Sequence, residues 1–152
     1  MPQETTTITT PKQMTFTPAD VENYLDSLAD EEEVGLTCSG SNCLMARAAM
    51  RLFPGYYVLV YTQTLSLTPM SHYVEVLGIC GQKIPLPSVL TRMYQHFDML
   101  GGSGFDGMDR AICKAEWMSH WREAVAQSPF LQQYYGEDGR LLPREQRREE
   151  SH

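Results

Sequence analysis

Apolar side chains recur at helical spacing in four stretches of the chain, and capping residues precede some of these stretches. Thr17 can cap the first helix, Pro18 suits its first position, and Asp20 can complete a capping box. Ser41 or Asn42 can cap the second. The spacing predicts helices that start near residues 18, 43, 88 and 106, the last continuing to about residue 126.

A different pattern occupies residues 56–80, where Tyr, Val, Leu and Ile predominate. It predicts a hairpin with one strand over 56–67, a turn at 68–71 and a second strand over 72–80. A short strand at 34–37 is also compatible with the sequence, and the prolines within 83–87 favour an extended segment. We therefore predict an α+β fold, with a small antiparallel sheet (hairpin about 56–80) packed against about four helices.

The length and composition fit one folded unit. The chain has 152 residues, of which 42% are hydrophobic and 20% charged, so it can form a core of its own. We expect a flexible N-terminal arm over 1–15, a single globular domain over 16–135 and a polar, charged tail over 136–152.

The charge is concentrated near the start of the chain. The formal net charge is −7, and residues 1–33 hold eight acidic residues against one basic residue. The acidic run at 30–33 fits either a solvated helix end or an acidic docking patch. Without a basic field, we expect no direct binding to nucleic acid. We also expect a cytoplasmic protein that does not enter a membrane, because neither a secretory signal nor a membrane-spanning stretch is present in the sequence.

Cys38 and Cys43 flank a possible helix start in the stretch LTCSGSNCLM. A helix N-terminus favours the thiolate form of cysteine, and His72 could supply a base. The Cys-Ser-Gly sequence before a helix and the Ser-His sequence before an apolar strand resemble the NlpC/P60 peptidases. That resemblance implies a thiol hydrolase with Cys38 or Cys43 as the nucleophile, His72 as its partner and Gln82 as the candidate third polar residue.

Two other interpretations of the cysteines remain open. The spacing of Cys38 and Cys43, together with Cys113 and His120 further along, could contribute to a zinc-stabilised module. Free cysteines are more often small buried residues, and four irregularly spaced cysteines do not suggest a disulfide framework. On this basis we expect no cofactor and no metal.

Four aromatic residues carry the leading functional hypothesis. Trp117 and Trp121 are four residues apart on the last predicted helix, and Tyr134 and Tyr135 follow a Pro-marked turn. If Trp121 or the tyrosine pair stays partly exposed, it can anchor a protein contact, because aromatic residues dominate interface energetics. We therefore expect an acidic accessory domain without catalytic machinery, which binds another protein or associates with itself.

Overall fold

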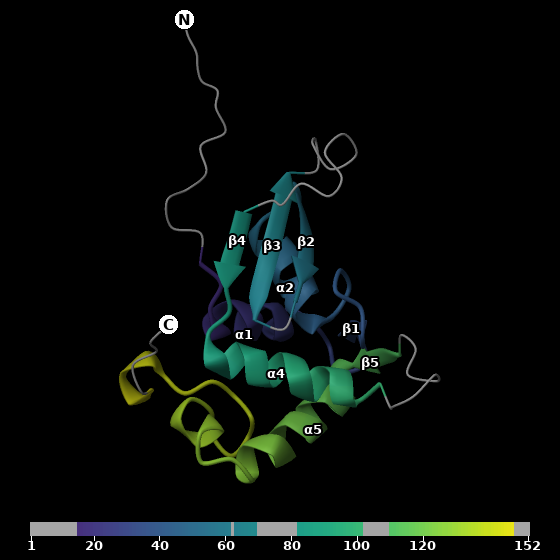
Figure 1. Ribbon diagram of the computed structural model, residues 1–152. Helices are drawn as coiled ribbons and strands as arrows, with labels where there is room; N and C mark the ends of the chain where they lie inside the picture. Colours follow the sequence, from purple (N-terminus) through teal and green to yellow (C-terminus); the bar gives the residue numbers. More distant parts are fainter. Residues whose placement is uncertain (1–14, 62, 70–81, 102–109, 148–152) are drawn as a thin grey trace, which may run out of the picture.

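The computed structural model describes residues 15–61, 63–69, 82–101 and 110–147 (Figure 1). These residues form four α-helices and two small antiparallel sheets, which confirms the predicted α+β class. Figure 1 shows the three-stranded sheet above helices α4 and α5. Buried side chains from both sheets and all four helices form one continuous core.

Helix α1 (Pro18–Asp26) begins as predicted. The backbone N–H of Thr17 donates to Oδ2 of Asp20 at 2.8 Å, so the capping residues fix the first turn. Val21, Tyr24 and Leu25 form its buried face. The Tyr24 hydroxyl donates to the carbonyl of Val34 at 2.8 Å, which ties the helix to the first strand.

The two-stranded sheet joins distant parts of the chain. Strand β1 (Glu33–Leu36) pairs antiparallel with β5 (Ala111–Cys113), and Gly35 lies opposite Ile112. A Cβ atom on Gly35 would lie 2.6 Å from the Leu44 backbone nitrogen, so glycine permits this close approach to the second helix.

The pairing of β5 corrects the predicted start of the last helix. Residues 111–113 form a strand, and α5 (Lys114–Ala126) begins immediately afterwards, with Cys113 at its N-cap position. Ile112 suits either element, and the backbone partners offered by β1 decide in favour of the strand. The predicted helix start near residue 106 lies outside the described residues.

The three-stranded sheet corrects the predicted strand boundaries. Strand β2 (Tyr56–Val60) pairs antiparallel with β3 (Thr64–Pro69), and the N–H of Tyr61 donates to the Thr64 carbonyl at 2.8 Å. The chain therefore reverses direction between Tyr61 and Thr64, inside the stretch 56–67 predicted to be one strand. Strand β4 (Gln82–Pro85) pairs with β3, which confirms the extended conformation expected there. The predicted strand at 72–80 lies outside the described residues.

Helices cover the buried faces of these strands. Helix α2 (Leu44–Leu52) contributes Leu44, Met45, Ala48 and Ala49, and α4 (Ser88–Met99) contributes Val89, Leu90, Met93 and Phe97. The sheet contributes Val58, Val60, Leu65, Leu67 and Ile84. The buried helix positions follow the helical spacing of apolar residues, whereas Leu52, the last residue of α2, is 41% exposed.

The segment after Gly136, expected to be a polar, charged tail, contacts the rest of the chain through its residues as far as Leu142. It follows a short 3-10 helix, η3 (Leu131–Gln133), and Tyr135 forms a β-bridge with Leu141. Arg140 forms ion pairs with Glu22 and Asp26 of α1. A second 3-10 helix, η4 (Arg144–Gln146), follows.

Candidate functional site

The cysteine loop, residues 37–43, connects β1 to α2 and is fixed by contacts with distant segments. Cys38 has a φ of 59°, in the left-handed region, and its N–H donates to Oδ1 of Asp98 at 2.9 Å. The Thr37 side chain is buried, and its hydroxyl oxygen accepts the N–H of Arg110 at 3.0 Å. The conformation at Cys38 is unusual for a side-chain-bearing residue. The hydrogen bonds of Thr37 and Cys38 with Arg110 and Asp98 stabilise it.

The two cysteines of this loop have opposite environments. Cys38 is exposed, whereas Cys43 is buried and occupies the N-cap position of α2. The prediction of Ser41 or Asn42 as the cap is therefore wrong. Burial raises the pKa of Cys43 to about 11, an effect that outweighs the nearby backbone N–H groups. Cys43 is a core residue, and only Cys38 of this pair has the accessibility that a nucleophile needs.

A carboxyl and a phenol on α4 lie near the cysteine loop. The Tyr94 side chain is hydrogen-bonded to Asp98, and burial raises the pKa of Tyr94 to about 12. Burial also raises the pKa of Asp98, against the lowering effect of its hydrogen bonds with Cys38 and Tyr94. His72, the expected partner of a catalytic thiol, lies outside the described residues. Gln82 lies on β4, opposite Leu67 of β3.

The four aromatic residues of the leading hypothesis are all buried. Trp117 and Trp121 stack with ring centroids 5.3 Å apart, and Tyr135 meets Trp121 edge-on at 5.2 Å. Trp121 is 1% exposed, and Tyr134 and Tyr135 are 7% and 2% exposed. The expectation that Trp121 or the tyrosine pair stays partly exposed is therefore wrong.

The chain that follows the four aromatic residues contributes to the burial of Trp121. A Cβ atom on Gly139 would lie 3.5 Å from Cδ1 of Trp121 and 2.9 Å from Cγ of Arg122. The turn at Gly139, with a φ of 76°, therefore lies directly against α5. Sequence spacing placed Trp117 and Trp121 on one face correctly. It could not show that the polar segment after Gly136 folds back over Trp121.

Two histidines, one on α4 and one on α5, face each other between these helices. Nδ1 of His96 and Nε2 of His120 are 3.2 Å apart, and both rings are half-buried. Burial, the neighbouring His120 and then Arg92 lower the pKa of His96. Within the described residues, no group of three or more His, Cys, Asp or Glu side chains is placed to hold a metal ion. Helical spacing could have placed each ring on a helix face, but not the crossing of the two helices.

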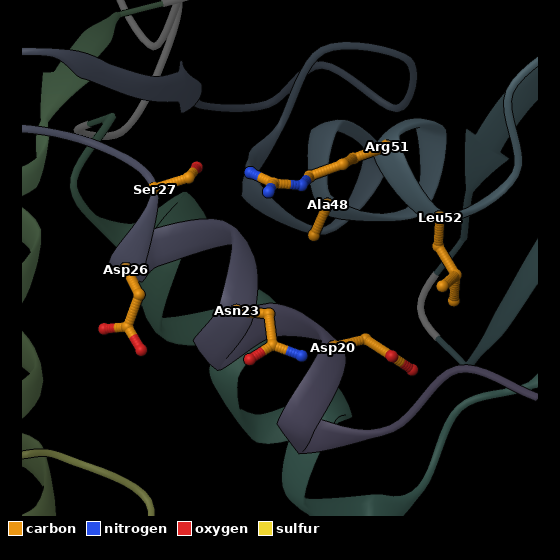
Figure 2. A pocket seen from close by; sticks show the side chains of 7 residues that line it. All are labelled: Asp20, Asn23, Asp26, Ser27, Ala48, Arg51 and Leu52. Carbon is orange, nitrogen blue, oxygen red and sulfur yellow. The ribbon is translucent and has the colours of Figure 1, made fainter.

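A groove of about 490 Å³ lies between α1 and α2 (Figure 2). Asp20, Asn23, Asp26 and Ser27 line it from α1, and Ala48, Arg51 and Leu52 line it from α2. In Figure 2 the Arg51 guanidinium extends toward the Ser27 end of α1, whereas Leu52 lies toward the Asp20 end. Leu52 is an exposed apolar side chain, and it gives the groove an apolar end.

No protein-family model matches the chain, and no curated protein or solved structure shows significant similarity to it. None of the helices in the described part of the chain has the length and apolar character needed to cross a membrane.

Proposed function

We propose that the protein is a binding module whose α1–α2 groove docks a short segment of a partner protein. The observation that carries this proposal is the exposed, apolar Leu52 beside an acidic helix. This keeps the accessory, protein-binding role expected from the sequence but moves it from the buried aromatics to another surface. A groove of about 490 Å³ falls within the usual range for binding pockets, roughly 300–1,000 Å³.

The apolar part of the groove sets the first requirement for the partner. Ala48 is buried and small, so it leaves room between the helices, and Leu52 projects beside it. Leu52 is 41% exposed at the last position of α2, where an apolar side chain of the partner can cover it. The groove therefore suits one aliphatic or aromatic anchor.

The charged part of the groove sets the second requirement for the partner. Asp20 and Asp26 lie on α1, the helix that precedes the acidic run at 30–33. The same helix already accepts a guanidinium, because Arg140 forms ion pairs with Glu22 and Asp26. The partner segment we propose therefore carries Arg or Lys next to its apolar anchor, and Arg51 can donate to its backbone carbonyls.

The proposal can be tested with displayed peptides selected against the folded protein. Selected peptides should converge on an apolar residue adjacent to a basic one. Replacing Leu52 with Glu should weaken their binding at least about tenfold, the equivalent of 1.4 kcal/mol, because it puts a charge at the apolar contact. The matched control is Met99→Ala, an exposed apolar position on α4 that is 64% exposed.

Three results would contradict the docking proposal. The first is failure to select any peptide, and the second is selection of peptides that bind the Leu52→Glu variant as tightly as the native protein. The third is self-association through Leu52, which would assign the groove to a second copy. Sedimentation of the native protein and the variant over a range of concentrations distinguishes that case.

Cys38 supports a second candidate, the thiol hydrolase suggested by the NlpC/P60 resemblance. The supporting observation is an exposed thiol on a left-handed residue whose backbone is held by Asp98. A catalytic His72 should accelerate alkylation of Cys38 near neutral pH, and His72→Ala should slow it. Equal alkylation rates with and without His72 would contradict this function.

We also propose, as a third candidate, a zinc-stabilised module in which Cys38 and Cys43 bind the metal. Zinc analysis of protein purified without a tag tests this candidate, and protein that contains no zinc would contradict it.

A further inference from the structure

Helix α5 runs at an angle below α4 (Figure 1), and each helix contributes one imidazole ring to a contact between them. The ring of His96 meets Trp121 edge-on at 5.8 Å between centroids. The ring of His120 lies 6.0 Å from that of Trp117. Because both indoles are buried, these contacts restrict the two histidine rings before any ligand arrives.

The separation of the two nitrogens suits a shared metal ion. Nδ1 of His96 and Nε2 of His120 are 3.2 Å apart. With metal–nitrogen bonds of about 2.05 Å to each ring, this separation gives an N–metal–N angle of about 100°, close to the tetrahedral value. The same separation also fits a single N–H···N hydrogen bond, which is the competing explanation.

The chemistry of the site limits the kind of metal. Imidazole nitrogen binds Zn²⁺, Cu²⁺ and Ni²⁺ well and is a poor ligand for Mg²⁺ or Ca²⁺. His96 and His120 are both half-buried, so the pair is not sealed inside the core. We propose that His96 and His120 form a two-histidine site for a divalent transition-metal ion that links α4 to α5, with water in the remaining positions.

Such an ion would bind the folded chain more tightly than the unfolded chain, since the two ligands are 24 residues apart in sequence and meet only on folding. It would therefore raise the unfolding temperature. Free metal at ten times its Kd multiplies the folded-to-unfolded ratio about 11-fold for a single native-state site. This inference is independent of the proposed docking groove, which lies between α1 and α2.

The test is thermal unfolding of the tag-free full chain with Zn²⁺, in a Cys38→Ser background that removes one exposed thiol as a competing ligand. Zn²⁺ should raise the unfolding temperature of this protein. His96→Gln and His120→Gln should each weaken Zn²⁺ binding at least about tenfold, because one imidazole remains. His152→Gln, a change at the last residue of the chain, is the matched control and should keep the full response.

Nitrogen NMR of the histidine rings provides a second measurement that does not depend on the variants folding. Zn²⁺ should shift the Nδ1 resonance of His96 and the Nε2 resonance of His120 together and with one Kd. The site is excluded if neither resonance moves at millimolar Zn²⁺, which would leave a hydrogen-bonded pair only. It is also excluded if the thermal response is the same in both glutamine variants as in the parent protein.

Discussion

At the scale of single residues, two cysteines only five positions apart differ because of burial. The helix N-terminus argument applies to Cys43, which occupies the N-cap position of α2. The core around that thiol nevertheless raises its pKa, so desolvation outweighs the helix terminus. Cys38 lies outside the helix, on a left-handed residue, and its thiol is exposed.

Alkylation should therefore distinguish the two cysteines. At pH 7.5, a thiol with a pKa of about 11 is ionised in roughly one molecule in three thousand. Iodoacetamide should modify Cys38 in the folded protein and reach Cys43 only after unfolding, as followed by mass spectrometry of peptides. Cys38→Ser is the control that removes the fast site. Modification of Cys43 at the rate of Cys38 would show that the core is open at this point.

Asp98 should make stability depend on pH in an unusual direction for a carboxyl group. Burial raises its pKa in the folded state, so the folded chain holds this proton more tightly than the unfolded chain. Its contribution to stability is greatest at acidic pH and falls as the pH rises through the raised pKa. Asn can still accept the Cys38 N–H, so Asp98→Asn should gain stability relative to the native protein between pH 4 and pH 7.

Unfolding of both proteins by denaturant at several pH values measures that difference. The effects of the other carboxylates on the free energy of unfolding cancel when the two proteins are compared, because both proteins contain them. A native protein that gains stability relative to Asp98→Asn as the pH rises would mean that the pKa of Asp98 is lowered, so that its hydrogen bonds outweigh burial.

At the scale of elements, α5 contributes to the core rather than to a contact surface. Its aromatic stripe meets Phe97 and His96 of α4 edge-on, and it meets Tyr135 edge-on as well. The periodicity of the sequence located the stripe, and the neighbouring elements determine that it is fully covered.

Replacing Trp121 with Ala should consequently destabilise the fold. Loss of a buried Trp typically costs roughly 3–5 kcal/mol, because the transfer free energy is lost and a cavity remains. Met99→Ala, at an exposed position of α4, should change stability by about 0.5 kcal/mol or less. Chemical denaturation of both variants checks this. A Trp121→Ala protein as stable as the native chain would restore the surface role that burial contradicts.

At the scale of the whole molecule, the two ends of the described chain support each other. Arg140 reaches α1, and the N–H of Leu142 donates to the Tyr134 carbonyl at 2.8 Å. The segment over 136–147 therefore covers Trp121 and contacts the first helix at the same time.

Deleting residues 136–152 should cost much more stability than removing the ion pairs alone. Arg140→Ala should cost roughly 1 kcal/mol or less, since the Arg140 side chain is 48% exposed and solvent screens its ion pairs. The deletion also uncovers Trp121, and exposing about 100 Å² of apolar surface costs roughly 2.5 kcal/mol. Denaturation midpoints and tryptophan emission follow both effects. Equal midpoints for the deletion and Arg140→Ala would mean that the segment contributes only its charges.

The sequence by itself determined the elements whose signals are local. Thr17, Pro18 and Asp20 define the start of α1 because a cap is made by residues that are neighbours in the chain. The apolar faces of α2 and α4 follow from spacing of three and four, and the α+β class follows from the order of such segments.

Only the tertiary structure decided what depends on contacts between distant segments. Ile112 became part of a strand because β1 offers it backbone partners, and the chain reversed near Tyr61 because β3 pairs with β2 there. Trp121 was buried by a polar segment, and His96 met His120 through the crossing of two helices. None of these contacts leaves a periodic signal in the chain, because each depends on partners that are far apart in sequence.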